Sequence, residues 1–223
     1  MSLNIFIFIG LPGGGKGSLS KLCIENLGWN QLSTGNLCRS HIAKQTEIGK
    51  KIDFIIKSGN LISDGIMTEM VEQWLKDNSL KSHIIFDGYP RTVVQAKALH
   101  NLLKTNFVAC KLNVVKLVAD ELTVIKRLSS RMVCSNKDCQ IVYSANADSS
   151  LVPLKLDSCD KCKSLLIKRD DDKESTIKER LSVYSRHEKE LVDFYLTSGQ
   201  NVVEINAEQT IHAVFNDFKK LIS

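Results

Sequence analysis

Apolar and polar residues follow one another along the chain in patterns that predict a strand first and a helix next. Residues Leu3–Ile9 form a nearly continuous apolar run, LNIFIFI, which is typical of a parallel strand buried on both faces. In the next segment the apolar positions recur at helical spacing: Leu19, Leu22, Cys23 and Leu27. A glycine-rich loop joins the two predicted elements.

The same succession continues downstream. Three further apolar stretches predict strands, at His83–Asp87, Val114–Val118 and Asn201–Ile205. Helical segments separate them or follow them, at Met67–Lys76 and Ile211–Ile222. Strands that take turns with helices predict an α/β fold, in which helices cover both faces of a parallel sheet.

One segment, Met132–Lys168, breaks this rhythm. It has little periodicity, and it contains four of the seven cysteines of the chain, the polar run SANADSS and Pro153. We therefore predict an inserted minidomain at this place.

The four cysteines of this segment have the spacing of a metal site. Four residues separate Cys134 from Cys139, nineteen follow, and two separate Cys159 from Cys162. Two close pairs about twenty residues apart are typical of a tetrahedral thiolate site for Zn²⁺, and four thiolates leave the metal no open position, so such a zinc ion is structural. The alternative is a set of four free cysteines without metal.

Composition describes an ordinary globular protein. The 223 residues suit one domain with insertions, and the net charge of +5 is compatible with anionic ligands without requiring nucleic acid. No apolar stretch reaches the roughly 18 residues of a membrane span, and the apolar start lacks the features of a signal peptide, so we expect a cytoplasmic protein. Three isolated cysteines are expected to be small buried hydrophobes: Cys23, Cys38 and Cys110.

The loop after the first predicted strand reads GLPGGGKGS. Gly10, Gly15 and Lys16 fit the phosphate-binding pattern G-x-x-x-x-G-K-[ST], but Gly17 stands where the hydroxyl residue is expected, and Ser18 follows it. A glycine turn between a strand and a helix directs backbone N–H groups at phosphate oxygens, and the lysine adds a mobile positive charge. The loop therefore indicates a nucleotide site of a particular kind.

The predicted strand His83–Asp87 ends in an acid. In a parallel sheet this position lies at the carboxyl edge, where a carboxylate that organises Mg²⁺ is found beside a phosphate loop. We predict this role for Asp87.

Taken together, the motifs resemble the adenylate kinase family, in which a glycine also follows the loop lysine. Besides the loop, six blocks follow in the order of that family: LSTGNLCR, TEIGKKI, SGNLISD, FDGYPRTVVQA, RLSSR and KRDDDKESTIKERL. The blocks extend through nearly the whole chain.

The resemblance implies roles for individual residues. The positions implied to bind AMP are Thr34, Arg39, Leu61, Ile62, Gly88, Arg91, Gln95, Arg169 and Arg180, with Gln95 at the adenine edge. The positions implied to bind ATP are Gly13, Gly14, Gly15, Lys16, Gly17, Ser18, Arg127, Arg131 and Tyr143. The implied catalytic set is Lys16, Asp87, Arg91, Arg127, Arg131, Arg169 and Arg180, and Asp171 and Asp172 are implied to support these arginines.

This inventory suits the chemistry of phosphoryl transfer. The transferred group spreads negative charge over three oxygens, so the site needs cations, and arginine holds phosphate oxygens with a planar fork. The attacking phosphate oxygen of AMP is already ionised at neutral pH, so no general base is required. The five histidines therefore receive no catalytic role.

The implied fold is a three-layer α/β P-loop kinase core (residues 1–31, 65–131 and 169–223) with two insertions. These are a helical arm that binds the nucleoside monophosphate (residues 32–64) and a zinc-ribbon-like lid, called the flap below (residues 132–168). The implied reaction converts ATP and AMP to two ADP with Mg²⁺, in adenine nucleotide homeostasis, and we expect a monomer that binds neither nucleic acid nor membrane.

Two groups of alternatives remain at this point. The chain could be another nucleoside monophosphate kinase or use GTP as donor, although Thr34 and Gln95 favour AMP and the long flap favours the adenylate branch. A non-catalytic nucleic-acid-binding protein with a zinc ribbon is the alternative of another class, and the lack of interleaved aromatic residues in the flap counts against it. Asn36 departs from the family, which has aspartate there, and this raises the question of closure and substrate choice.

Overall fold

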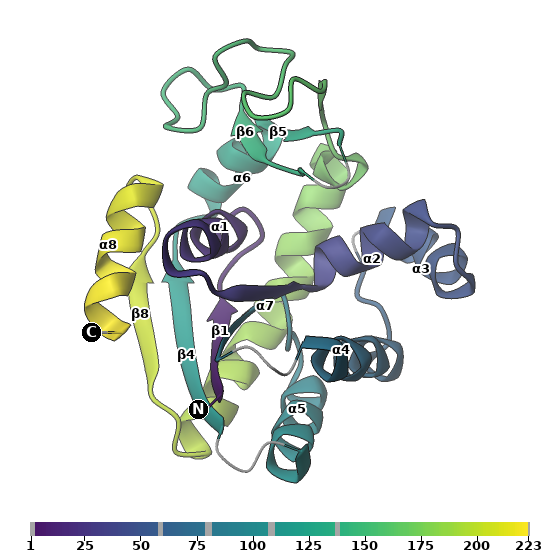
Figure 1. Cartoon of the computed structure of the whole chain (residues 1–223), viewed down its shortest axis with the longest axis vertical. Helices are drawn as coiled ribbons and strands as arrows, with labels where there is room; N and C mark the ends of the chain where they lie inside the picture. The colour runs from purple at the N-terminus through teal and green to yellow at the C-terminus, as the bar shows by residue number, and fades with distance from the viewer. Residues whose placement is uncertain (1–2, 58–59, 79–81, 107–109, 137–138, 223) are drawn as a thin grey trace.

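A parallel sheet forms the centre of the protein. The computed structural model describes residues 3–57, 60–78, 82–106, 110–136 and 139–222. Its five-stranded sheet has the order β2-β3-β1-β4-β8, with all neighbours parallel (Figure 1). The strands are β1 (Leu3–Ile9), β2 (Asn30–Ser33), β3 (His83–Asp87), β4 (Cys110–Val118) and β8 (Val202–Asn206). Because the strands are parallel, their carboxyl ends meet at one edge, where open α/β sheets bind ligands.

Strand β1 shows why the sheet needs cover on both faces. Ile5, Ile7 and Ile9 belong to one buried cluster, and Phe6 and Phe8, which point the other way, belong to a second. Alternate residues of a strand point to opposite faces of the sheet. Because both sets of β1 side chains are apolar, both faces need a layer of helices to cover them.

The helices provide these two layers. α1 (Lys16–Leu27) and α8 (Ile211–Ile222) pack on the phenylalanine side, and α4 (Asp64–Asn78), α5 (Val93–Asn106) and α7 (Glu174–Thr197) pack on the isoleucine side. α6 (Glu121–Ser129) leads from the sheet toward the flap, and a single 3₁₀ turn, η1 (Asp170–Asp172), leads back from it. The predicted three-layer α/β core is confirmed.

Two further helices form the arm on the right of Figure 1: α2 (Thr34–Ala43) and α3 (Glu47–Lys57). They pack at very close range, because a Cβ atom on Gly49 would lie only 2.1 Å from the carbonyl oxygen of His41. Only glycine permits this approach. The glycine of the TEIGKKI block therefore sets the geometry of the arm.

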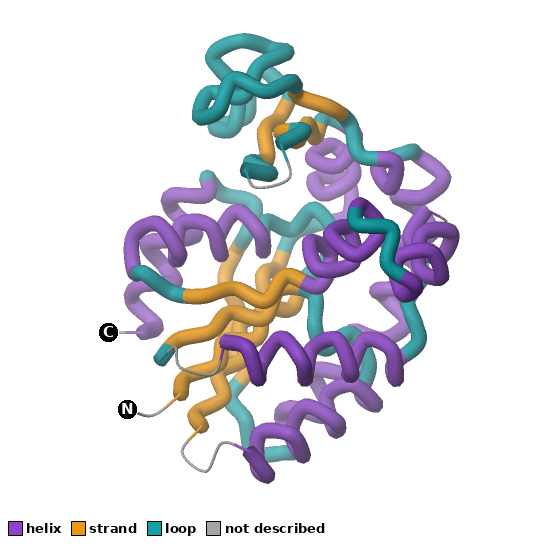
Figure 2. The backbone as a smooth tube through the Cα atoms, turned by 45° about the vertical axis from the view of Figure 1, so that its right-hand side comes forward, coloured by secondary structure: helices purple, strands orange, loops and turns teal. Residues whose placement is uncertain are grey.

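The flap is a small unit of short strands and loops beyond the carboxyl edge of the sheet, at the top of Figures 1 and 2. Its strands β5 (Arg131–Cys134), β6 (Val142–Ser144) and β7 (Leu166–Ile167) form an antiparallel sheet in the order β6-β5-β7. Its own buried cluster is small and consists of Cys134, Tyr143, Cys159 and Leu166. The flap segment thus forms its own small sheet and its own buried cluster, and its status as a separate domain stays a prediction.

The structure extends the sequence predictions at several places. Strand β4 begins at Cys110, four residues before the predicted start, and β8 ends one residue later than predicted. Strand β2 was not predicted, since its sequence NQLS has one apolar residue. Leu32 and Ser33, which we assigned to the arm, pair in β2 with Phe86 and Asp87 of β3, so the helices of the arm begin at Thr34.

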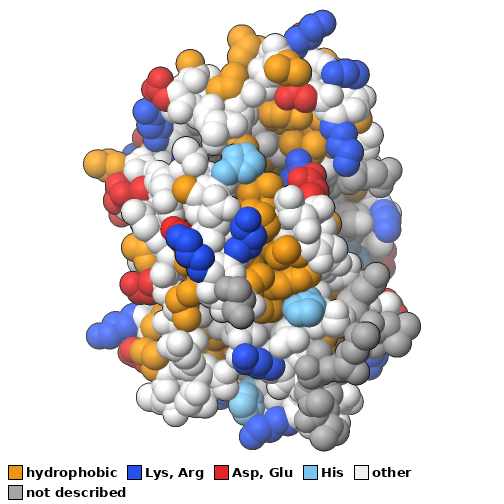
Figure 3. Space-filling view, turned by 60° about the vertical axis from the view of Figure 1, so that its left-hand side comes forward, with side chains coloured by type: hydrophobic (Ala, Val, Ile, Leu, Met, Phe, Trp, Pro, Cys, Tyr) orange, Lys and Arg blue, Asp and Glu red, His pale blue; other side chains and the backbone are white. Residues whose placement is uncertain are grey.

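The surface is mixed in character. On the face drawn in Figure 3, lysine and arginine side chains are interspersed with acidic and apolar ones. Within the described ranges, every helix is too short or too polar to cross a membrane.

Candidate active site

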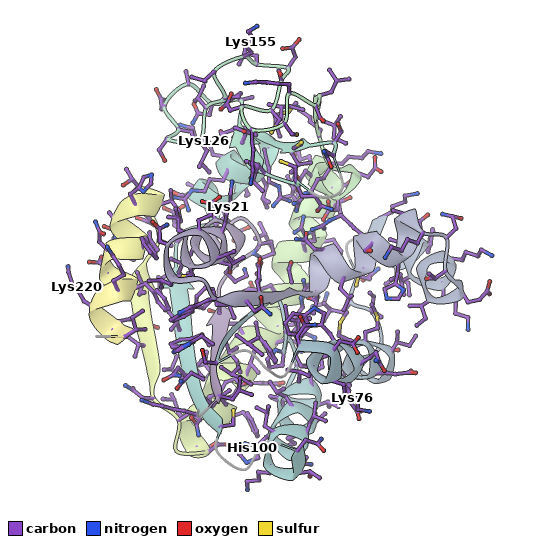
Figure 4. All side chains as sticks on the ribbon, in the orientation of Figure 1. Lys21, Lys76, His100, Lys126, Lys155 and Lys220 are labelled. Carbon is purple, nitrogen blue, oxygen red and sulfur yellow. The ribbon has the colours of Figure 1, made fainter. Side chains whose placement is uncertain are left out.

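A deep cleft of about 1230 Å³ lies between the carboxyl edge of the sheet, the arm and the flap. The phosphate loop, the start of α1, helix α2 and the base of the flap all contribute to its walls. Lys21 of α1 and Lys126 of α6, labelled in Figure 4, add positive charge on the side near the flap.

Every residue that the resemblance assigned to a nucleotide or to catalysis lines this cleft. They are Gly13, Gly14, Gly15, Lys16, Gly17, Ser18, Thr34, Arg39, Leu61, Ile62, Asp87, Gly88, Arg91, Gln95, Arg127, Arg131, Tyr143, Arg169 and Arg180. These positions span most of the chain, so only the folded protein brings them together.

The phosphate loop ends in a left-handed turn at the start of α1. Gly15 has φ 91° and is the N-cap of the helix, which begins at Lys16. This backbone conformation is strained for a residue with a Cβ atom, which accounts for glycine. The turn exposes the free N–H groups of the first helical turn to the cleft, where they can bind an anion.

Lys16 lies folded into the loop. Its Nζ donates to the carbonyl oxygens of Gly10 at 2.5 Å and of Leu11 at 2.9 Å. Burial foremost, together with nearby arginines, lowers the pKa of Lys16 to about 8, against the opposing effect of Asp87. An incoming phosphate would favour the protonated amine.

The structure explains why glycine follows the lysine. A Cβ atom on Gly17 would lie 3.3 Å from Oδ2 of Asp87, and this same oxygen accepts a hydrogen bond from Nε2 of Gln31 at 3.2 Å. Asp87 therefore occupies the space that a serine or threonine side chain would enter. The acid at the end of β3 therefore lies directly against the start of α1.

Two acids at the root of the flap hold two of the arginines. Asp172 accepts from Nε of Arg131 at 2.7 Å and also from its Nη2, and it receives Nη1 of Arg180 at 3.2 Å. The carboxylate of Asp171 forms an ion pair with Nη1 of Arg180 at 3.1 Å, and the backbone carbonyl oxygen of Asp171 accepts a hydrogen bond from the same nitrogen at 3.0 Å. Burial acts to raise the pKa of Asp171, but the surrounding guanidinium groups, Arg180 foremost, hold it below its usual range.

Two other arginines carry charge that the protein compensates less. Burial, followed by repulsion from Arg131 and Arg39, lowers the pKa of Arg169. Arg39 donates from Nη2 to Oδ1 of Asn36 at 2.6 Å, while its buried Nε is among the few buried polar atoms with no hydrogen-bond partner in the described part of the chain. Such buried, partly unpaired cations are suited to bind an anion.

On the arm side of the cleft, Gly88 contacts two of the implied AMP-binding residues. Its carbonyl oxygen accepts from Oγ1 of Thr34 and from Nε of Arg91, both at 2.9 Å, and its φ of 83° belongs to the left-handed region. The Tyr89–Pro90 peptide bond that follows is cis. Arg91 is thus held by its inner nitrogen, and its outer nitrogens have no hydrogen-bond partner among the residues that the structure describes.

Tyr143 contacts the cysteine cluster of the flap, which we did not expect from its implied role in binding ATP. Although the residue lines the cleft, its hydroxyl lies 3.5 Å from Sγ of Cys159 and accepts from the backbone N–H of Asp160 at 3.0 Å. The hydroxyl therefore belongs to the cysteine cluster of the flap.

The four flap cysteines converge. Their sulfur atoms all lie within 4.8 Å of one another, with Cys134 and Cys162 at 3.3 Å and Cys139 and Cys159 at 3.7 Å. A zinc ion at its usual distance of about 2.3 Å from each sulfur needs sulfur atoms about 3.8 Å apart. The wider first pair, with four intervening residues, therefore still reaches the geometry of a metal site.

Backbone N–H groups also point at these sulfurs. Asn136, Ile141 and Ser164 donate to Cys134, Cys139 and Cys162, respectively, and each donor lies two residues after its cysteine. Such donors stabilise thiolates and hold ligating side chains in place. The donor set fits a zinc ion.

Sequence reasoning missed two residues that position the site. Gln31 contacts Asp87, and Asp64 contacts Gln95. Asp64 stands at the end of the SGNLISD block as the first residue of α4, and Gln31 lies in the short strand β2. The acid at a helix start was a visible signal, whereas the role of Gln31 depends on a strand that its sequence does not predict.

Comparison with known proteins agrees with this geometry. The profile of the family described as adenylate kinase matches residues 8–200. The chain belongs to the adenylate kinase family. An adenylate kinase from Archaeoglobus fulgidus is 36% identical over 97% of this chain and 96% of its own length. Those from Lactobacillus helveticus (37%, covering 97% of each chain) and Fervidobacterium nodosum (40%, covering 85% of this chain and 84% of the relative) are similar.

Membership of this family makes the chain a phosphotransferase that acts on AMP and ATP. It also accounts for the departure in the phosphate loop, since the glycine after the lysine belongs to the arrangement around Asp87. The alternatives of a different monophosphate kinase or a nucleic-acid-binding protein are not favoured.

Proposed function

We propose that the protein transfers the γ-phosphoryl group of ATP reversibly to AMP, giving two ADP, with the cleft cations as the catalytic groups. The single observation that carries this proposal is the convergence of Lys16 and of the arginines of four separate segments on one cleft between the phosphate loop and the arm. Two nucleotides that bring their phosphates together need this concentration of positive charge.

On the donor side, ATP binds with its phosphates on the loop. The free N–H groups at the start of α1 and the Nζ of Lys16 bind the phosphate oxygens, and Arg127 and Arg131 approach from the side of the flap. Asp87 would lie near the Mg²⁺ ion that accompanies ATP, and this ion would supply positive charge beside the phosphates. The contact of Asp87 with the start of α1 supports this assignment.

On the acceptor side, AMP binds between the arm and β3. Arg39 and Arg91 hold its phosphate, Thr34, Gly88, Leu61 and Ile62 surround the nucleoside, and Gln95 contacts the adenine edge. The free outer nitrogens of Arg91 and the unpaired Nε of Arg39 support this placement.

In the transfer, an oxygen of the AMP phosphate forms a bond to the γ-phosphorus while the bond from that phosphorus to the β,γ-bridging oxygen breaks. Arg131, Arg169 and Arg180 stabilise the charge on the transferring group, and Asp171 and Asp172 keep two of these arginines oriented. Closure of the flap excludes water, which would otherwise accept the phosphoryl group.

The flap binds zinc as a structural ion. Cys134, Cys139, Cys159 and Cys162 would complete a tetrahedral site with no position for substrate. The flap is under 40 residues long and has few buried apolar side chains, so a metal supplies the stability that its small core does not. The monomeric state and the cytoplasmic location stay predictions.

A coupled assay over a panel of nucleotides tests the proposal. Purified protein with Mg²⁺, ATP and AMP should form two ADP for each AMP consumed, and EDTA should stop the reaction. Replacing AMP by UMP or CMP, and ATP by GTP, defines the acceptor and donor. Turnover with UMP but none with AMP, in a folded sample, would overturn the acceptor assignment.

A further inference from the structure

The side-chain amide of Gln95 is held at both ends by the protein. Its Oε1 accepts from the backbone N–H of Arg91 at 2.7 Å, and its Nε2 donates to Oδ1 of Asp64 at 2.8 Å. The side chain is almost completely buried, with only 2% of the residue exposed, yet it lines the cleft. A primary amide has two donor hydrogens and two acceptor sites on oxygen. One of each is therefore left for a ligand.

These two contacts determine which end of the amide is oxygen. Rotation of the amide by 180° would set its NH₂ group against the N–H of Arg91 and its oxygen against the carboxylate of Asp64. Both contacts would then be repulsive, and buried groups would lose their partners. One of the two groups that orient the amide, the N–H of Arg91, belongs to the backbone. The other is a side chain, the carboxylate of Asp64, and it alone can be changed by substitution.

Orientation of the amide decides which purine it matches. Adenine presents an amino donor at C6 and an acceptor at N1, whereas a 6-oxopurine presents a carbonyl acceptor at C6 and an N1–H donor. An amide oxygen paired with the amino group and an amide N–H paired with N1 suit adenine. The rotated amide has the complementary pattern for a 6-oxopurine.

We propose that Asp64 is a specificity-determining positioning residue, which holds Gln95 in the orientation that accepts adenine and opposes a 6-oxopurine. The inference rests on the proposed function, in which Gln95 contacts the base of AMP. Asp64 acts through Gln95, since it is not among the described residues that line the cleft. It reads no atom of the substrate itself.

Asp64 is well placed for this task. It is the first residue of α4, and the same oxygen that receives Gln95 also accepts from Oγ1 of Thr92 at 3.0 Å. Thr92 in turn accepts, through Oγ1, from the backbone N–H of Gln95 at 3.2 Å. The carboxylate, the threonine and the glutamine thus form a closed set of hydrogen bonds between α4 and the start of α5. An ionised carboxylate can only accept hydrogen bonds, whereas the side-chain amide of an asparagine can also donate.

The test is the ratio of kcat/KM for AMP to that for inosine monophosphate (IMP), in the whole protein with saturating Mg²⁺ and ATP. In Asp64→Asn, the ratio should fall about tenfold, the loss expected when a hydrogen bond to a charged acceptor no longer opposes amide rotation. The KM for AMP should rise and that for IMP should fall or stay unchanged, while the KM for ATP stays the same. A purely structural role would move both acceptors in the same direction.

The matched control is Asp77→Asn. Asp77 lies on the same helix as Asp64 and is exposed, and it also accepts a hydrogen bond from a glutamine amide, Nε2 of Gln73 at 3.2 Å. Asp77→Asn therefore makes the same change in charge on the same helix as Asp64→Asn. Its AMP-to-IMP ratio should equal that of the unmodified protein. If Asp64→Asn does not fold, as judged by its melting transition, Asp64→Ala measured at low temperature serves in its place.

Gln95→Leu separates the inference from the proposed function. If this variant loses discrimination while Asp64→Asn and Asp64→Ala keep it, Gln95 reads the base and Asp64 does not orient it, so the inference is overturned alone. If Gln95→Leu also keeps full discrimination, the placement of the adenine is wrong and both statements fall together.

Discussion

The cleft brings several cations close together and the flap brings four thiols close together, but the two regions stabilise these groups differently. In the cleft, Lys16 and several arginines lie on helices and loops of a core with large apolar clusters, and Asp171 and Asp172 offset part of their charge. In the flap, four cysteines form much of the buried cluster themselves. We therefore expect the cleft to keep its shape without its anionic ligand, and the flap to need a metal ion to keep its shape.

The largest expected effect lies in the cleft. Arg91→Ala should lower kcat/KM by about 10³ to 10⁵, or about 4–7 kcal/mol, because an arginine directed at phosphoryl groups carries effects of this size. Its melting temperature should change little, since the hydrogen bond from Nε of Arg91 to the carbonyl oxygen of Gly88 is exposed to solvent. Calorimetry and steady-state kinetics on the same sample check this. If Arg91→Ala instead destabilised the protein, and the molecules that remained folded had normal activity, Arg91 would be a structural residue.

The flap should show the opposite balance. Replacing Cys159 and Cys162 by serine should abolish bound zinc and lower the melting temperature, by about 2–4 °C for each kcal/mol lost, while activity at low temperature falls only modestly. Elemental analysis, calorimetry and kinetics measure the three quantities. Cys23→Ser and Cys110→Ser, outside the flap, are the controls for thiol loss and should retain the metal. A protein prepared without chelator that contains no zinc would disprove the metal site.

A smaller effect should follow the protonation of Lys16. Because the pKa of its amine is about 8 without ligand and a bound phosphate favours the charged form, ATP binding takes up a proton above this pH. Below pH 8 the amine is already charged and affinity should be flat. Above it, the Kd of a non-hydrolysable ATP analogue should rise by up to about tenfold per pH unit. In Lys16→Arg the side chain stays charged, so the Kd of the analogue should not rise with pH. If the Kd of the unmodified protein were equally independent of pH, the role of Lys16 protonation would be contradicted.

The smallest effect concerns Asn36. In Asn36→Asp a carboxylate would replace the amide oxygen that Arg39 now contacts at 2.6 Å, and it would compete with the phosphate of AMP. Position 36 itself is exposed to solvent, which weakens its interaction with Arg39, so the KM for AMP should rise only about two- to fivefold. The KM for ATP is the internal control. The difference should shrink at high salt, and an effect that salt leaves unchanged would point to a cause other than charge.

Local patterns predicted much of the core. The run Leu3–Ile9 is β1, and Ile211–Ile222 is α8 to the residue, because each buries a periodic apolar face. The short strand β2 escaped prediction, since three of its four residues are polar and its place beside β3 comes from pairing with distant residues. The division into core, arm and flap, and the role of each site residue, stay predictions.

Residue types and their spacing were enough to indicate a phosphate loop and a four-cysteine site, because these groups lie in short motifs whose chemistry is local. The set of arginines was implied by the resemblance to the family. The contacts that orient them were decided only in the folded protein. Asp64 lies 31 residues from Gln95, and Arg131 lies 41 residues from Asp172, so no pattern within a single segment links them. Tyr143 shows the same limit, because the packing of the flap directs its hydroxyl to Cys159. Hydrogen-bond partners depend on distance in space, which chain folding sets, whereas the chemistry of a motif depends on the residues it contains.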